Sequence, residues 1–561
     1  MTGRAKGLPA LLAAVLSSSL IGLDGMMTPL VLPAITQDPD AGPTMQQWPP
    51  AAFLLPLAGL LLVSGALGDV YDRWRVFGFG AAGFCVAALV CALAPNPGLP
   101  IADRLVQGAG AALMVPGALA VISTTFDGAA QGRAIARWSG WSGPSVIAGP
   151  LLAGALLEVG SWRYVYGALA LLAALVVALI AYAAPARERR AEATVDRGAV
   201  LAVPAVAGPV FALIQGPSLG WTDPLILTAA AAGLASAAAF LWWEARAPRP
   251  LLPLELFRIR TFTVLNAVTF LLYGGLVCSG FYTVLFLRQT AGYSPTAAGL
   301  TAAVPLMVVL LLSGRAGALA DRLGHRWLIA GGSLVSGAGQ LLMLRAGAEP
   351  RFLAEVLPAM LVHGAGLALL VAPLTAGVLG AAGPEHAGAA SGIDNAVART
   401  GSLLGITVVG LVISAQSTAS LERASAPPAV VEQARDHPLA IVPPENLPPP
   451  EIPHARKALQ GAASDAFHAA TAVLGGLGIA AGLLAAIGTG RRRPGDHRPA
   501  DAVPLAGRTA PTRNKGCCGD RTVPRPGSPP GGVEREMAAV HRGPGTHAFN
   551  AAPPVALSCR P

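Results

Sequence analysis

A charged segment, Gly65-Ala66-Leu67-Gly68-Asp69-Val70-Tyr71-Asp72-Arg73-Trp74-Arg75, lies between two apolar runs. It recurs 252 residues further along, as Gly317-Ala318-Leu319-Ala320-Asp321-Arg322-Leu323-Gly324-His325-Arg326-Trp327. Gly, Leu, Asp and an Arg-bearing tail occupy the same register in both copies. A pattern that returns at the same place between apolar runs indicates an internal repeat.

The residues of this repeated segment suit a tight connection between two membrane helices. Small residues let helix ends approach closely, and an Asp can accept hydrogen bonds at a helix N-terminus or pair with an Arg. Arg side chains favour an anionic membrane face. One copy alone could equally be a plain charged turn between helices, but two aligned copies argue against that alternative.

The composition is typical of a membrane protein. Of the 561 residues, 53% are hydrophobic and 12% are charged, whereas a soluble chain carries about 25% charged residues. The net charge of +9 does not indicate nucleic-acid binding, because the Arg residues fall in short loops and in the C-terminal tail. We find no phosphate-binding loop, metal-ligand spacing, nucleophile elbow or paired carboxylates in the sequence. We therefore expect no enzyme activity, no metal and no cofactor, and an ion gradient as the energy source.

Fourteen apolar runs are each about 20 residues or longer, the length that a helix needs to span a bilayer. The least regular runs are 198–216, which holds two prolines, and 395–414, which holds Arg399. The Arg-, Pro- and Gly-rich tail 489–561 has no apolar period and is predicted to be disordered. The predicted spans are 10–33, 48–68, 76–95, 99–125, 134–157, 163–184, 198–216, 224–243, 262–287, 296–316, 327–346, 354–380, 395–414 and 464–488.

The distribution of Arg predicts the orientation of these spans. With an even number of spans both termini lie on one side, and that side collects most of the Arg residues and both repeated segments. Both termini are therefore predicted to be cytoplasmic.

Eight spans lie between the two copies instead of the six of a simple duplication, which predicts an inserted pair. The predicted parts are a cytoplasmic N-terminus (1–9), a six-helix bundle (10–184), the inserted pair with cytoplasmic loops (185–260), a second bundle (261–488) with a Pro-rich outward loop (415–463), and a cytoplasmic tail (489–561).

The repeated segment resembles the loop signature of the major facilitator superfamily, and further motifs are similar to its fourteen-helix drug:proton antiporter branch. The motifs are Leu23-Asp24-Gly25-Met26-Met27-Thr28 in the first span, Arg104-Leu105-Val106-Gln107-Gly108-Ala109-Gly110 in the fourth and Gly149-Pro150-Leu151-Leu152-Ala153-Gly154 in the fifth. Thr28 stands one position late, and Asp72 and Trp74 replace the usual Gly and basic residue of the loop, which puts the turn geometry of this copy in doubt. The resemblance implies an all-α integral membrane protein with the major facilitator fold, built of two six-helix bundles plus two inserted helices.

Asp24 and Arg104 are the strongest candidates for function. A carboxylate inside an apolar span is costly and marks an ion or substrate path. A guanidinium in a span keeps its charge at any working pH and needs a partner. We therefore predict that Asp24 takes part in proton coupling, and the resemblance implies that Arg104 faces the cavity and influences proton binding nearby. The alternatives are a structural Asp24 at the end of its helix, and a packing ion pair of Arg104 with Asp103 or with a helix end.

The resemblance also implies roles for other residues. The repeated loops are expected to gate the rocking of the two bundles, through Gly65, Asp69, Arg73, Gly317, Asp321, Arg322, Gly324 and Arg326. The element of Gly149, Pro150 and Gly154 is expected to block leak in exporters, with a generic kinked helix as the alternative. Candidates for lining a cavity are Gln107, Trp138, Trp141 and His363; for the two tryptophans and the histidine a packing role is the alternative. Arg399 is expected to form a structural pair, with Asp394 or with another helix.

The predicted function is proton-driven export of amphipathic organic compounds, drugs or antibiotics, by alternating access. The predicted partners are a small organic substrate, protons and the lipid bilayer, without nucleic acid, for a monomer in the bacterial plasma membrane. Two alternatives stay open: a facilitator or importer of a small metabolite, and a membrane sensor that does not transport. The direction of counterflow in vesicles separates export from import, and binding without flux would indicate a sensor.

Overall fold

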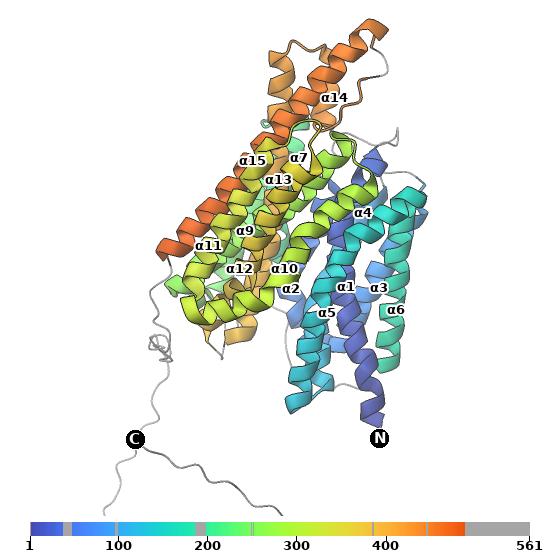
Figure 1. Ribbon diagram of the computed structural model, residues 1–561. Helices are drawn as coiled ribbons and strands as arrows, with labels where there is room; N and C mark the ends of the chain where they lie inside the picture. Colours follow the sequence, from blue (N-terminus) through green and yellow to red (C-terminus); the bar gives the residue numbers. More distant parts are fainter. Residues whose placement is uncertain are drawn as a thin grey trace, which may run out of the picture. The chain divides into compact units, whose positions relative to one another are not determined.

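The computed structural model describes residues 2–36, 48–95, 99–185, 198–247, 250, 252–383, 386–444 and 447–488. Within these ranges the chain is almost entirely helical (Figure 1). The tail 489–561, predicted to be disordered, lies outside the described residues. The first six helices are α1 (Thr2–Thr36), α2 (Trp48–Tyr71), α3 (Arg73–Leu93), α4 (Leu99–Thr125), α5 (Gly128–Val159) and α6 (Arg163–Ala183).

The remaining helices follow the order that the apolar runs predict. The predicted run 198–216 forms one continuous helix in spite of its prolines. The helices are α7 (Ala199–Leu219), α8 (Pro224–Glu244), α9 (Arg260–Gln289), α10 (Pro295–Leu323), α11 (His325–Leu342), α12 (Leu357–Ala382), α13 (Ala387–Arg423), α14 (Pro428–Asp436) and α15 (Ile452–Gly488).

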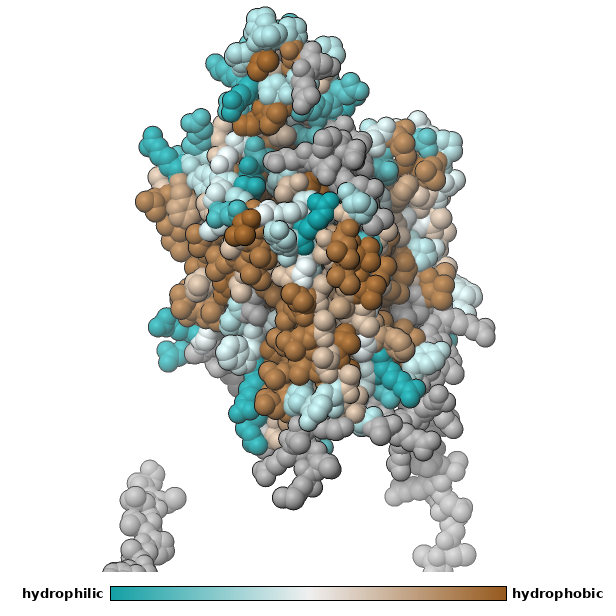
Figure 2. Space-filling model, turned by 90° about the vertical axis from the view of Figure 1, so that its right-hand side faces the viewer, coloured by the Kyte–Doolittle hydropathy of each residue, from teal (hydrophilic) through white to brown (hydrophobic). Residues whose placement is uncertain are grey.

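The chain is a multi-pass membrane protein. Twelve of the described helices are long and apolar enough to cross a membrane, and α2 and α5 carry shorter apolar stretches, Trp48–Leu61 and Val146–Val159. Large apolar side chains such as Phe79 of α3 and Leu171 of α6 are exposed. On the face drawn in Figure 2, apolar residues gather in a middle band and polar residues lie toward both ends. An exposed apolar band of this kind is stable only in lipid.

The helices alternate in direction, so the molecule has two sides. We call the side where α1 begins the near side and the side where α1 ends the far side. Both connections of the repeated segment, between α2 and α3 and between α10 and α11, lie on the near side. α1 to α6 pack among themselves as one bundle, and α9 to α13 pack with α15 as a second bundle.

Matching glycine contacts occur at equivalent places in the two bundles. A Cβ atom added to Gly110 of α4 would lie 2.6 Å from the Gly80 carbonyl oxygen of α3. A Cβ atom added to Gly366 of α12 would lie 2.6 Å from the Gly332 carbonyl oxygen of α11. Gly80 and Gly332 are 252 residues apart, as are the two copies of the repeated segment. The internal repeat therefore extends from the loops into the helix packing.

In the inserted pair α7–α8, α7 packs against both bundles. α7 packs against α2 of the first bundle and against α13 of the second, and α8 packs on α7. Glycines allow the contact of α7 with α2 and the contact of α7 with α8. A Cβ atom added to Gly59 of α2 would lie 3.1 Å from Val203 of α7, and one added to Gly233 of α8 would lie 3.0 Å from Gly208 of α7. Close backbone approach at small residues is the usual way that helices associate in lipid.

The two bundles share an apolar core only on the far side. One large cluster extends through the first bundle and includes residues from the far half of the second, such as Phe286 of α9, Ala298 of α10 and Ile406 of α13. The near half of the second bundle has its own cluster, which includes Leu265 of α9 and Leu374 of α12. Among the described residues, that near-side cluster has no member from α1–α6. The structure thus has a closed far side.

The predicted loop 415–463 is longer than the connection in the structure, because α13 and α15 both extend into the predicted range. α13 extends to Arg423 and α15 begins at Ile452, with α14 between them. Leu421 of α13, Val430 of α14 and Leu459 of α15 are buried together in a small apolar cluster. We call residues 421–462 the far-side cap. Its proline content suggested an open loop, but its apolar residues give it a core of its own.

The first copy of the repeated segment keeps the turn of the second copy despite its sequence departure. Gly324, before α11, has φ of 83°, and the equivalent Asp72, before α3, has φ of 99°. This positive φ is strained for a residue with a Cβ atom. The Asp72 carboxylate compensates by accepting hydrogen bonds from the backbone N–H of Trp74 (2.8 Å) and Arg75 (3.2 Å). The side chains of Asp69 and Asp321 lie outside the described part of the structure; Gly65 lies in α2 and Gly317 in α10.

Two substitutions at Asp72 should therefore have different effects on stability. Asp72→Ala removes the helix cap and keeps the strained φ, so it should destabilise the protein by about 1 kcal/mol. Asp72→Gly also removes the cap but relieves strain of about 1–3 kcal/mol, so it should be neutral or stabilising. Thermal unfolding of the purified protein in detergent measures both. A glycine variant that melts below the alanine variant would contradict the strained-turn interpretation.

Candidate functional site

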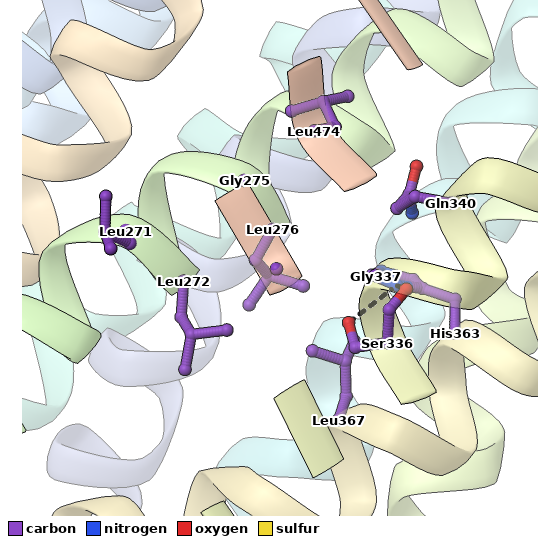
Figure 3. A pocket seen from close by; sticks show the side chains of 11 residues that line it. Leu271, Leu272, Gly275, Leu276, Ser336, Gly337, Gln340, His363, Leu367 and Leu474 are labelled. Atoms are coloured by element: carbon purple, nitrogen blue, oxygen red, sulfur yellow. Dashed lines mark hydrogen bonds between the residues drawn. The ribbon is translucent and has the colours of Figure 1, made fainter. Parts of the chain in front are cut away.

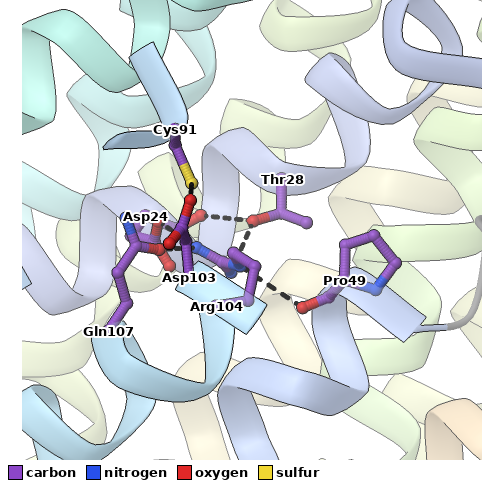
Figure 4. A network of polar contacts seen from close by, with 7 residues as sticks. All are labelled: Asp24, Thr28, Pro49, Cys91, Asp103, Arg104 and Gln107. Carbon is purple, nitrogen blue, oxygen red and sulfur yellow. Dashed lines mark hydrogen bonds and ion pairs between the residues drawn. The ribbon is translucent and has the colours of Figure 1, made fainter. Parts of the chain in front are cut away.

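The two strongest candidates from the sequence form a direct ion pair inside the first bundle (Figure 4). Arg104 of α4 and Asp24 of α1 are both only 1% exposed, and Arg104 Nη1 lies 2.5 Å from Asp24 Oδ1. The expected alternative partner of Arg104, Asp103, instead accepts a 3.7 Å hydrogen bond from the Cys91 thiol. Removing one partner of such a buried pair leaves an uncompensated charge, which is strongly destabilising.

Four more groups surround the Arg104 guanidinium. Gln107 Oε1 accepts from Nη1 at 2.7 Å and Thr28 Oγ1 accepts from Nη2 at 3.1 Å. The Pro49 carbonyl oxygen of α2 accepts from Nε at 3.3 Å. The Phe53 ring lies below the guanidinium, with Cζ 4.6 Å from its centre, in cation–π contact. The sequence pointed to Gln107, whereas Pro49 and Phe53 carry no recognisable signal because a carbonyl and a ring are present in many apolar runs.

Thr28 has a defined place in this network. Its hydroxyl donates to the Asp24 carbonyl oxygen one turn earlier, at 2.9 Å, while it accepts from Arg104. The displacement of Thr28 by one position in the motif puts it at i+4 from Asp24, on the same face of α1. The departure from the family pattern therefore still supplies an oxygen to the site.

Two polar atoms in the site remain without a partner among the described residues. These are Asp24 Oδ2 and Gln107 Nε2, and both are buried. A buried acceptor without a partner costs free energy. A carboxylate with one oxygen bonded to a guanidinium and the other unbonded has a defined position at which it can accept a proton.

Glycines of the α4 motif position the site. A Cβ atom added to Gly108 would collide with the Phe53 carbonyl oxygen of α2, and one added to Gly110 would press on α3. Both glycines are therefore packing positions. The close approach at Gly108 keeps the start of α2 within reach of Arg104.

The α5 element of Gly149, Pro150 and Gly154 contacts both bundles. A Cβ atom added to Gly149 would lie 3.3 Å from the Leu23 carbonyl oxygen of α1, next to Asp24. One added to Gly154 would lie 2.8 Å from Thr296 Cα at the start of α10. The Pro150 carbonyl oxygen in turn faces Gly299 of α10. The element therefore packs the far half of α5 against α10, across the boundary between bundles.

The candidates for lining a cavity have different surroundings. Trp138 of α5 is half-buried and donates from Nε1 to Ser18 Oγ of α1 at 2.9 Å, so it joins α5 to α1. Trp141 is 66% exposed. Gln107 is fully buried against Arg104 and belongs to the ion-pair network.

His363 lies inside the second bundle, away from α1–α6. It is 4% exposed, and its Nδ1 lies 3.0 Å from Ser336 Oγ and 3.2 Å from the Ser336 carbonyl oxygen, both of α11. Figure 3 shows it beside a small pocket with Gln340 of α11 and Leu276 of α9. The pocket has a volume of about 20 Å³, room for one water molecule. These surroundings favour the packing role that the sequence left as the alternative.

The basic residues of the repeated loops differ in their contacts. Arg326, at the start of α11, donates from Nη2 to the Ala486 carbonyl oxygen near the end of α15. A cation at a helix C-terminus is favourable there. Arg322 is exposed and Arg73 is half-buried. Among the described side chains, no group of three or more His, Cys, Asp or Glu is placed to hold a metal ion.

Comparison with known proteins identifies the class to which this architecture belongs. The profile of the Major Facilitator Superfamily matches residues 14–406. The chain therefore belongs to this superfamily, and it is a membrane transporter for small molecules and not an enzyme.

Similar proteins include named resistance proteins. The chain is 32% identical to the multidrug resistance protein Stp of Mycobacterium tuberculosis, over 73% of this chain and 77% of that protein. It is 33% identical to the methylenomycin A resistance protein of Streptomyces coelicolor, over 68% and 81% of the two chains. It is 32% identical to the puromycin resistance protein pur8 of Streptomyces alboniger, over 76% and 85%.

Solved structures of transporters with low sequence identity share the fold. A crystal structure of an auto-inhibited POT family peptide transporter aligns with a TM-score of 0.58 at 17% identity, over 88% of this chain and 99% of that chain. A D-xylose–proton symporter aligns with a TM-score of 0.55 at 15% identity, over 86% and 98%.

The role of Gly108 in positioning the ion pair can be tested with a matched glycine. Gly108→Ala should destabilise the protein by about 1–3 kcal/mol, because the new methyl group overpacks the contact between α4 and α2. Gly25→Ala is the control: nothing lies within 4 Å of the added Cβ atom, and alanine favours the helix by about 1 kcal/mol. Thermal unfolding in detergent should rank the variants in that order, and equal melting temperatures would contradict the close contact.

Proposed function

We propose that this transporter is a proton-driven exporter of amphipathic organic compounds, such as antibiotics. The observation that carries the proposal is the buried Asp24–Arg104 pair, whose second carboxylate oxygen has no partner among the described residues. The named functions of the relatives support export, since one is described as a tetracenomycin C resistance and export protein of Streptomyces glaucescens. Fourteen spans, cytoplasmic termini and a monomer in the bacterial plasma membrane are part of this proposal.

In the proposed mechanism, a proton binds at Asp24 Oδ2. Protonation removes the negative charge from the pair and leaves the Arg104 charge without a counterion. The three neutral acceptors around Arg104, on Thr28, Pro49 and Gln107, hold the guanidinium in place but cannot neutralise it. The local charge of the site thus changes by one unit while its geometry is kept. A charge difference of this kind can make one arrangement of the bundles more favourable than the other.

The proposed alternating access uses both sides of the molecule. On the far side, Gly154 and Gly299 let α5 and α10 approach closely, which supports a closed outer side when the near side is accessible. On the near side, Asp69, Arg73, Asp321 and Arg322 of the repeated loops are proposed to stabilise the opposite arrangement. We propose that the near side is the cytoplasmic side, where Arg residues are concentrated. The far-side cap then faces outward.

Export by this mechanism should depend on both the proton gradient and Asp24. In a pump-deficient bacterial host, cells that express the chain should accumulate several-fold less ethidium, and tolerate more puromycin, than cells with empty vector. A protonophore should abolish the difference in ethidium. Asp24→Asn should also abolish it, because the amide keeps the size of the side chain but cannot exchange the proton.

The controls separate coupling from folding. Gly25→Ala, beside Asp24, should export as the wild type does, and membrane levels of all variants should be compared by immunoblot. Export at the normal rate by Asp24→Asn would exclude Asp24 from coupling. Export that persists with the protonophore would exclude the proton gradient as the energy source.

A further inference from the structure

A second arginine inside a predicted span, Arg399, lies in the other bundle. It lies 12 residues after the start of α13 at Ala387, which places it about 18 Å along the helix from the near side. A hydrocarbon layer is about 30 Å thick, so this depth corresponds to the middle of the membrane. Its side chain is only partly exposed.

The expected partner of Arg399 is engaged elsewhere. Asp394 accepts a 2.8 Å hydrogen bond from Thr269 Oγ1 of α9, and it forms no ion pair with Arg399. Within the described ranges, the Arg399 guanidinium has neither a hydrogen-bond acceptor nor an ion-pair partner. None of its nitrogens belongs to the buried polar atoms that lack a hydrogen-bond partner. Because these nitrogens have no partner, each must be at least partly accessible. The predicted structural pair is therefore not formed.

The surroundings indicate which space the guanidinium faces. Tyr273 of α9 interacts electrostatically with both Asp394 and Arg399, so the three side chains form one polar group between α9 and α13. α9 packs against α1, and α13 packs against α2, so both helices border the first bundle. Arginines in membrane spans face protein or a water-filled cavity, not lipid. This polar group therefore faces the region between the two bundles.

We propose that Arg399 binds an anionic group of the transported compound, such as a carboxylate, phenolate or enolate. This inference rests on the proposed transport of organic compounds and concerns those that carry an acidic group, whereas ethidium and puromycin carry none. Arginine stays charged at any working pH, and its planar fork of donors matches a carboxylate. Asp394 does not neutralise it, because Thr269 holds that carboxylate at α9.

In this proposal the two arginines inside spans, Arg104 and Arg399, have different roles. In the first bundle, Arg104 is 1% exposed, and Asp24, Gln107, Thr28 and the Pro49 carbonyl oxygen accept four of its five N–H donors. In the second bundle, Arg399 has its donors unused. The first arginine belongs to a closed network, whereas the second is an open binding group.

The test uses two probes that differ in one group, 4-(1-pyrenyl)butanoate and 4-(1-pyrenyl)butanol. Equilibrium binding to the purified full-length protein is followed by pyrene fluorescence, without any proton gradient. The wild type should bind the acid about tenfold more tightly than the alcohol, as expected for one charge-assisted contact. Arg399→Gln should remove that preference and leave binding of the alcohol unchanged. Arg399→Lys, which keeps the charge, should retain most of it.

A matched control is available on the same helix. Arg423→Gln removes an arginine from the far end of α13, whose hydrogen bonds within the described ranges go to Ser420 and Ala419, and it should keep the acid preference. The proposal is overturned if the wild type does not bind the acid more tightly than the alcohol, whether both bind equally or neither binds. It is also overturned if Arg399→Gln keeps the preference. Failure of proton-driven export in cells would leave this result unaffected, because the binding assay uses no gradient.

Discussion

The close approach of helix backbones at glycine is the constraint on which the site depends. In lipid there is little hydrophobic force to bring helices together, so association relies on contact and hydrogen bonding. Gly108 lets α4 approach the Phe53 carbonyl oxygen of α2, and Gly149 lets α5 approach α1 beside Asp24. These contacts bring α1, α2 and α4 within one side-chain length of each other. Only then can a single guanidinium bond Asp24, Thr28 and the Pro49 carbonyl oxygen together.

The repeat explains why the two bundles are alike in packing and different in chemistry. The glycine contact of α3 with α4 recurs between α11 and α12, with the same spacing in the sequence as the loops. The polar residues do not recur. The first bundle has a charge pair at α1 and α4, whereas the second has a His363–Ser336 contact inside and, at its boundary, an Arg399 without an ion-pair partner among the described residues. Duplication has preserved the backbone contacts and left the buried polar groups free to diverge.

Much of the fold could be predicted from the sequence, because apolar length and the repeated loop depend on local residues. Asp24 and Arg104 stood out individually as charges inside spans. Their pairing could not be predicted, since it depends on the register of helices 80 residues apart. The far-side cap was missed because prolines around 443–450 suggested an open loop, while the residues that form its core are spread over three helices. Arg399 was expected to pair with Asp394 or with another helix, but residues at i and i+5 do not share a helix face, and no partner from another helix is found among the described residues.

The far-side cap joins α13 and α15, so the two helices should move together. Both helices are 37 residues long, far more than a bilayer requires. Their projecting ends are joined through Val430 of α14 and by a 2.8 Å hydrogen bond from Ser420 to Asp465. Two helices tied together outside the membrane cannot tilt separately within it. Any rotation of the second bundle therefore produces a larger displacement at the cap. Movement inside the transporter could thus be followed from the exposed surface of the cap.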